Sequence, residues 1–383
     1  MFKLDSAVFD AALFLQQDWQ QRPKVFRQAF PQFKDPMTAD ELAGVALEPG
    51  VDSRLISQQD GKWDLKHGPI EDYSDLADSH WSLLVQAVNE HFPPAQKLLE
   101  AFRFLPDWRI DDLMVSYSTI GGGVGPHLDQ YDVFIIQGEG QRRWQIGERG
   151  EYTSVVPHPD LKQINGFKAD IDVILEPGDM IYIPAGFPHS GDSLKPSMNY
   201  SVGFRAPTQA ELLSALADYA LEHDALTARY QDQGEWPDKS WHINDAAYTQ
   251  MRQLMQNALN DEALLRRVCA NLLSQNPRPP LMQWPQDPIT ESGLLRYLQQ
   301  YAYLQRAVGL RMITTHLDGQ LHGLVQAQAY ELDSSAEQLF ECLLNVNYEI
   351  ETQALLPFLT TPLSRQLLVQ LINEGFWFAV NED

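Results

Sequence analysis

The sequence has few cysteines, and it contains no long hydrophobic run. Only Cys269 and Cys342 occur among 383 residues, which is too few for a disulfide framework or a thiolate metal site and is typical of a reducing compartment. The most apolar early stretch, residues 7–15, is interrupted by Asp10, so neither a signal peptide nor a membrane-spanning helix is expected. These absences predict a cytoplasmic protein that has no membrane partner.

Basic residues are also scarce. The chain has 28 Lys and Arg against 52 Asp and Glu, a net charge of −24. Residues 207–383 contain 10 basic and 22 acidic residues, so no basic module is hidden in the second half. The negative electrostatic field of such a protein repels nucleic acid and speeds encounter with a cationic partner such as a basic protein. A need for solubility alone explains the charge equally well.

The region between residues 111 and 206 has the pattern of a β domain. Short apolar runs are separated there by glycine and proline turns, and close spacing of such runs is typical of a sandwich or barrel. Strands are predicted over residues 113–118, 133–137, 142–146, 173–175, 180–183 and 200–204. Before this region, the apolar spacing between Leu83 and His91 predicts a helix that ends before Pro93.

Helical periodicity dominates after Pro207. Helices are predicted over residues 211–223 and 248–274, and a proline-rich stretch at 276–288 resembles a linker. A small mixed α+β domain is expected beyond it. The predicted domains are therefore 1–206, 207–275 and 276–383.

The most specific motif lies in the β region and contains a His-x-Asp pair. The run Gly-Gly-Gly-Val-Gly-Pro-His127-Leu-Asp129 is followed 62 residues later by His189, in a frame in which Pro184 and Gly186 close a strand that His189 ends. On an extended chain His127 and Asp129 point to the same side and can bind one ion. If the His189 strand lies beside them, the three residues form the 2-His-1-carboxylate face of non-haem Fe(II) oxygenases. The alternative is a pair of surface histidines in glycine loops.

These residues resemble the Jumonji-C branch of the cupin superfamily, the 2-oxoglutarate-dependent oxygenases. The runs Leu105-Pro-Asp-Trp-Arg-Ile-Asp-Asp-Leu-Met-Val-Ser-Tyr-Ser and Gly-Pro-His127-Leu-Asp129-Gln-Tyr-Asp-Val-Phe-Ile-Ile-Gln-Gly resemble the bacterial ribosomal oxygenases in particular. The resemblance implies that His127, Asp129 and His189 are catalytic Fe(II) ligands and that 2-oxoglutarate and O2 are co-substrates. It also implies hydroxylation of an arginine in a basic ribosomal protein, with large-subunit ribosomal protein sixteen as the suspected substrate.

The resemblance covers the whole chain and implies its architecture. The expected fold class is α+β: a double-stranded β-helix (the cupin or Jumonji-C barrel) in the catalytic domain 1–206, a helical dimerisation region at 207–275 and a winged-helix-like C-terminal domain at 276–383. A homodimer follows from the helical region.

The 2-oxoglutarate site requires a cation for the distal carboxylate of the co-substrate, and a guanidinium suits it because it forms two parallel charge-assisted hydrogen bonds. Arg142 and Arg143 are adjacent and face opposite sides of a strand, so periodicity cannot choose between them. Family spacing favours Arg142, and it gives Ser116 a hydroxyl contact to the same group. The alternatives are a solvent-facing arginine and an ordinary strand serine. Asn199 is a further candidate for orienting the co-substrate.

A substrate clamp is predicted from the same alternation. If Ser116 faces the pocket, Asp112 shares its side of the strand near the mouth, and Tyr131 follows His127 and Asp129 on the metal side. One carboxylate and one aromatic face would hold a guanidinium. The alternative is an Asp that serves a turn and a Tyr that packs in the core.

Three other functions are compatible with parts of this pattern. A histidine-hydroxylating ribosomal oxygenase has the same architecture, and a metal-dependent cupin enzyme that does not use 2-oxoglutarate would keep the barrel but would not need Arg142. A regulator that reads DNA through its C-terminal domain is opposed by the acidic balance of residues 207–383, so no direct DNA binding is expected.

Overall fold

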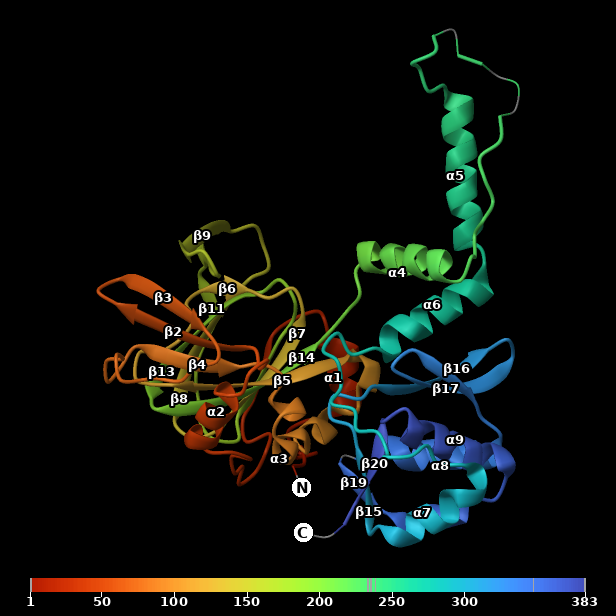
Figure 1. Ribbon diagram of the computed structural model, residues 1–383. Coiled ribbons are helices and arrows are strands. Elements are labelled where there is room, and N and C mark those ends of the chain that lie inside the picture. Colours follow the sequence, from red (N-terminus) through yellow and green to blue (C-terminus); the bar gives the residue numbers. More distant parts are fainter. Residues whose placement is uncertain (1, 233, 235, 238, 347, 382–383) are drawn as a thin grey trace. The chain divides into compact units, whose positions relative to one another are not determined.

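The computed structural model describes residues 2–232, 234, 236–237, 239–346 and 348–381. The chain forms two compact units, Met1–Ala206 and Pro207–Asp383 (Figure 1). Within the described residues, no helix combines the length and the apolar character needed to cross a membrane. The finer division into three domains stays a prediction.

The first unit is built on two antiparallel sheets. The larger sheet has eight strands in the order β1, β12, β7, β14, β5, β4, β2 and β3. Their bounds are Lys24–Phe26 (β1), Met180–Ile183 (β12), Asp132–Gln137 (β7), Ser197–Phe204 (β14), Ile110–Ser118 (β5), Trp81–Val85 (β4), Ser53–Gln59 (β2) and Lys62–His67 (β3).

The smaller sheet of this unit has four strands in the order β11, β8, β13 and β6. A separate two-stranded hairpin, β9 with β10, lies outside both sheets. The bounds are Ala169–Leu175 (β11), Gln141–Gly147 (β8), Pro188–Lys195 (β13), His127–Leu128 (β6), Thr153–His158 (β9) and Leu161–Asn165 (β10).

Strand β7 shows why the larger sheet is hydrophobic on both faces. Every residue of β7 is buried. Val133 and Ile135 pack with Trp144 of the smaller sheet, whereas Phe134 and Ile136 belong to a second core on the opposite face. A strand buried on both faces reads as a continuous apolar run, which is the pattern Val-Phe-Ile-Ile in the sequence.

Short helices cover that second face. Phe14 and Leu42 come from two of these helices and join the same core as Phe134. The α-helices are Ala11–Gln17 (α1), Ala39–Ala46 (α2) and Pro93–Gln96 (α3), and the 3-10 helices are Val88–Glu90 (η1), Leu99–Phe102 (η2) and Asp107–Arg109 (η3).

Each of the six strands predicted from the sequence lies in a strand of the structure, but the predicted helix at 83–91 is wrong. Strand β4 covers Trp81–Val85 and pairs with β2 on one side and β5 on the other. The run at 83, 84, 87 and 88 fits helical spacing, but Ala87 has a φ of 53° and interrupts it. Pairing with two neighbours therefore outweighs the local periodicity.

The second unit has helices and two three-stranded sheets, ordered β19, β15, β20 and β16, β17, β18. Its helices are Gln209–Glu222 (α4), Asp245–Leu259 (α5), Glu262–Ser274 (α6), Glu291–Gly293 (η4), Leu294–Gln300 (α7), Ser334–Leu344 (α8), Thr352–Phe358 (η5) and Pro362–Asn373 (α9). Its strands are Tyr303–Arg306 (β15), Met312–Leu317 (β16), Gln320–Val325 (β17), Gln328–Glu331 (β18), Glu349–Glu351 (β19) and Trp377–Val380 (β20).

The predicted single helix at 248–274 is two helices. Asn260 ends α5, and Asp261 is the N-cap of α6, where its side chain accepts a hydrogen bond from the Leu264 backbone N–H. An aspartate that caps a new helix in this way favours the start of a second helix at this point, and apolar periodicity alone does not reveal such a start. The mixed α+β content expected beyond residue 288 is present, and its winged-helix-like character stays a prediction.

Candidate metal centre and active-site pocket

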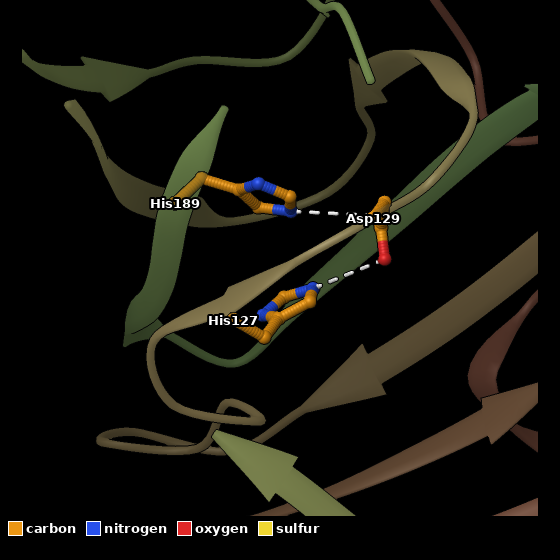
Figure 2. Close-up of side chains that lie close together, drawn as sticks. All are labelled: His127, Asp129 and His189. Atoms are coloured by element: carbon orange, nitrogen blue, oxygen red, sulfur yellow. Dashed lines mark ion pairs between the residues drawn. The ribbon is translucent and has the colours of Figure 1, made fainter. Parts of the chain in front are cut away.

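The structure brings His127, Asp129 and His189 together (Figure 2). His127 begins β6, and His189 lies directly opposite it on β13. His127 Nε2 is 3.8 Å from Asp129 Oδ1, and His189 Nε2 is 3.5 Å from Asp129 Oδ2. One potential ligand atom from each residue lies within 4.8 Å of the others, so the three side chains can hold a single ion.

One detail of the sequence interpretation is wrong. His189 does not end the strand that precedes Pro184, because β12 ends at Ile183 and the chain turns before His189 enters β13. The glycine of that turn, Gly186, has a φ of 79°, a left-handed conformation that glycine adopts at no steric cost. The turn reverses the chain and places His189 beside β6.

Hydrogen bonds fix both imidazoles. Nδ1 of His127 lies 3.0 Å from the Gly125 carbonyl oxygen, and Nδ1 of His189 lies 3.0 Å from the Phe187 carbonyl oxygen. A ring that donates through Nδ1 carries its lone pair on Nε2, the atom that faces Asp129. Burial, followed by the neighbouring His189, lowers the pKa of His127. The neutral imidazole that a metal ion requires is therefore favoured.

The carboxyl group of Asp129 is held in its ionised form. Burial opposes ionisation, but the adjacent imidazole of His189, followed by that of His127, outweighs burial and lowers the pKa of Asp129. Two imidazoles and one carboxylate form a donor set that fits a divalent transition metal such as Fe(II).

Arg142 lies in the same pocket as the three residues. It is buried, and it donates hydrogen bonds to the hydroxyls of Ser197, Ser116 and Ser118 at 2.9, 3.0 and 2.8 Å. Among the described residues no carboxylate pairs with Arg142, and burial lowers its pKa to about 9. A buried guanidinium that only hydroxyls and carbonyls contact fits the carboxylate of a bound anion.

Arg143 points the other way. It is exposed and pairs with Asp172, with Nε at 2.7 Å from Oδ1 and Nη2 at 2.5 Å from Oδ2. Strand alternation left the choice between the two arginines open, and their surroundings distinguish them. Sequence reasoning gave no role to Ser118 or Ser197, although strand alternation places Ser118 on the same face as Ser116, which the family resemblance selected.

Asn199 also faces this pocket, next to Ser116 across paired strands. Its side-chain nitrogen and oxygen are both buried, and neither has a hydrogen-bond partner among the described residues. A buried amide left without partners costs free energy unless a ligand or water satisfies it. The pocket is therefore suited to a polar ligand that contacts Arg142 and Asn199.

Asp112 and Tyr131 line the pocket as well. Asp112 is buried, and its Oδ2 accepts hydrogen bonds from Gln86 Nε2 at 2.7 Å and from the Ala87 backbone N–H at 2.8 Å. Tyr131 is 42% exposed, and desolvation together with the charges of Asp129 and Asp112 raises the pKa of its hydroxyl. Sequence reasoning missed Gln86, because no local pattern links it to Asp112.

A model of the JmjC domain matches residues 97–212, which include all three clustered residues and Arg142. The chain is 44% identical to the ribosomal protein uL16 3-hydroxylase of Escherichia coli, over 95% of this chain and 96% of that protein. The chain belongs to the Jumonji-C family. A probable ribosomal oxygenase of Haemophilus influenzae is 33% identical over 54% of this Jumonji-C chain and 52% of its own length.

Solved structures agree with this assignment. The X-ray structure of E. coli ycfD superposes with a TM-score of 0.87 at 41% identity and covers 98% of this chain and 99% of its own. A complex of the same ribosomal oxygenase with cobalt and 2-oxoglutarate gives a TM-score of 0.85 at 40% identity, over 99% of each chain. The predicted Jumonji-C fold and the prediction of an enzyme of this family are thereby confirmed, and the metal and 2-oxoglutarate in the relative agree with the predicted cofactors.

Proposed function

We propose that this chain is an Fe(II)- and 2-oxoglutarate-dependent hydroxylase that acts on an arginine side chain of a large-subunit ribosomal protein. The observation that carries the proposal is the position of Arg142, a buried cation without a carboxylate partner among the described residues, in the pocket that also holds His127, Asp129 and His189. A metal-dependent cupin enzyme that does not use 2-oxoglutarate would have no need for such a group.

The residues of the pocket have three different roles: binding the metal ion, binding 2-oxoglutarate and orienting 2-oxoglutarate. His127, Asp129 and His189 hold the metal ion, which together with 2-oxoglutarate supplies the oxygen-activating chemistry when bound. Arg142 and the hydroxyl of Ser116 bind the distal carboxylate of 2-oxoglutarate. The amide of Asn199 orients the same molecule. The protein thus contributes orientation, which selects one co-substrate geometry.

Asp112 and Tyr131 hold the substrate guanidinium. They line the same pocket as the metal ligands, and the charge of Asp112 acts on the Tyr131 hydroxyl, so the two side chains are near one another. A carboxylate and an aromatic face together suit a planar cation. A basic ribosomal protein also suits the net charge of −24. The name of the E. coli relative supports uL16, large-subunit ribosomal protein sixteen, as the substrate.

A homodimer formed through residues 207–275 belongs to the same proposal. None of the residues of α5 is buried, and Tyr248, Met251, Met255 and Leu259 recur at helical spacing with 62, 41, 66 and 47% of their surface exposed. An exposed apolar stripe of this kind is suited to a self-complementary, two-fold interface. Cytoplasmic location, with neither membrane nor DNA as a partner, completes the proposal.

The decisive experiment is an oxygen-dependent assay on uL16. The chain with Fe(II) should convert 2-oxoglutarate to succinate and add one oxygen to uL16, and fragment mass spectra should place that oxygen on an arginine. An oxygen placed on a histidine would make the chain a histidyl hydroxylase. Hydroxylation without succinate formation would favour a cupin enzyme independent of 2-oxoglutarate.

A further inference from the structure

The floor of the pocket is a ladder of paired residues on β5 and β14. Three cross-strand pairs line the pocket: Ser116 with Asn199, Met114 with Ser201, and Asp112 with Gly203. The first pair lies beside Arg142, and the third is four residues further along each strand, a distance of about 13 Å at 3.3 Å per residue. On β14 the side chain shrinks from asparagine to serine to none along this ladder.

Gly203 is the position of this ladder that has no side chain. A Cβ atom added to Gly203 would lie 3.4 Å from Asp112 Oδ1 and 3.9 and 4.0 Å from Cε2 and Cδ2 of the Tyr131 ring. The Asp112 carboxylate and the Tyr131 ring therefore both border the space above Gly203. We call this space the Gly203 slot.

No positive φ requires a glycine at this position. Gly203 is absent from the residues with positive φ and pairs with Asp112 and Val133, and the register between β14 and β5 shifts after it, between Gly203 and Phe204. Glycine inside a strand weakens the strand, and it commonly marks a bulge, such as the register shift beside Gly203, or the close approach of a ligand or of another segment of chain. An alanine would make only ordinary van der Waals contacts with Asp112 and Tyr131, so the neighbouring protein atoms do not exclude a methyl group.

Asp112 is oriented toward the slot. Its Oδ2 is fixed by Gln86 and by the Ala87 backbone N–H, while Oδ1 is the atom nearest to the position of a Gly203 side chain. Fixing one oxygen fixes the plane of the carboxylate and hence the direction of the other oxygen. The slot therefore contains a preorganised acceptor and is also bordered by the Tyr131 ring.

We propose that Gly203 is a specificity-determining residue, because the absence of a side chain there leaves the slot open for a planar cationic side chain of the substrate. The inference rests on the proposed function and adds to it the element that admits the guanidinium between Asp112 and Tyr131. A methyl group at position 203 would occupy the volume that the guanidinium needs. Binding of the substrate would be weakened, and binding of the metal and of 2-oxoglutarate would be unaffected.

The test is Gly203→Ala, compared with the unchanged protein and with Gly44→Ala. Gly44 is in α2, outside the pocket, and a Cβ added there has no atom within 4 Å. Calorimetry without oxygen gives the dissociation constant of an arginine-containing uL16 peptide, and 2-oxoglutarate turnover without peptide reports on the remaining site. Gly203→Ala should raise the peptide dissociation constant roughly tenfold or more, the effect of a misfitting methyl group in a pocket, with peptide-free turnover unchanged. Gly44→Ala should leave both unchanged.

Two outcomes overturn the inference. Unchanged peptide binding in Gly203→Ala means that the substrate enters elsewhere, and an equal loss of peptide-free turnover means that Gly203 supports the fold of the barrel. Failure of the proposed function is recognised separately, because the unchanged protein would then not hydroxylate an arginine of the peptide at all.

Discussion

Arg142 Nη1 donates a hydrogen bond to the hydroxyl oxygen of Ser116 over 3.0 Å, between strands that belong to different sheets. The neighbouring Arg143 instead forms an exposed ion pair with Asp172. Two adjacent arginines of the same strand thus have different surroundings. Arg142 is buried and has no carboxylate partner among the described residues, whereas Arg143 is exposed and paired with a carboxylate. They provide a matched pair of variants.

Arg142→Ala should raise the 2-oxoglutarate KM by at least about 30-fold, because loss of one partner of a buried charge pair costs about 2 kcal/mol or more. Arg143→Ala should change this KM by less than about threefold, since exposed ion pairs contribute little. Initial rates at varied 2-oxoglutarate concentration measure both values. The reverse order of effects would assign the co-substrate site to Arg143.

Replacement of His127 or Asp129 by alanine should abolish tight binding of Co(II) or Fe(II), because a site reduced to two ligands has little left to enforce its geometry. Metal titration calorimetry measures this loss without reference to turnover. His322→Ala is a suitable control, since His322 lies on β17 of the second unit, outside the triad. Unchanged metal binding in both triad variants would refute the ligand assignment.

From the sequence, the metal-binding residues of the site can be predicted more accurately than the helices and strands that contain them. His127 and Asp129 are separated by one residue, so local geometry alone places them on one side, and the glycine-rich frame of His189 signals a turn. The pairing of His189 with His127 depends on strand order, which no local pattern contains. Gln86 and Gly203 were missed for the same reason, since their roles arise only from segments that fold against Asp112.

Errors of secondary structure had similar causes. Leu83 and Leu84 lie in a strand between two neighbours, although their spacing of four residues to Ala87 and Val88 also fits a helix. Short apolar runs are ambiguous in this way, and the partners that decide them are distant in sequence.

The substrate clamp predicts a selective loss. Asp112→Ala and Tyr131→Ala should each reduce hydroxylation of the uL16 peptide by roughly tenfold or more, while peptide-free 2-oxoglutarate turnover stays near that of the unchanged protein. Parallel assays of peptide oxidation and succinate formation separate the two effects. If both reactions decrease together, these residues support the fold or the metal, and the substrate is held elsewhere.

The exposed apolar stripe of α5, which consists of Tyr248, Met251, Met255 and Leu259, predicts the oligomeric state. The chain should be a dimer in light scattering at micromolar concentration, and Met255→Glu should raise the dimer dissociation constant by about 100-fold or more, because two unpaired carboxylates would be buried at a two-fold interface. Gln253→Glu adds the same charge on another side of α5 and should leave the dimer intact. A monomeric unchanged protein, or equal effects of the two variants, would count against this interface.

The β9–β10 hairpin supports the segment that carries His127. Gln163 Nε2 donates to the Val124 carbonyl oxygen over 2.8 Å, and the Ile164 backbone N–H donates to the Pro126 carbonyl oxygen over 2.9 Å. Between these two anchors lies Gly125, whose carbonyl oxygen orients the imidazole of His127. Gln163 is only 9% exposed, so water cannot readily replace its amide.

Gln163→Ala should therefore loosen this segment and weaken Co(II) binding by about tenfold, at the lower end of the effects measured for groups that orient metal ligands. Gln141→Ala is the matched control, because the Gln141 amide donates a hydrogen bond to the exposed Glu176 and lies outside the pocket. The d–d absorption of the Co(II) form gives a second readout, since a reoriented His127 changes the ligand field and a merely less stable barrel does not. Metal affinity and spectrum that both match those of Gln141→Ala would show that the hairpin does not position the ligand.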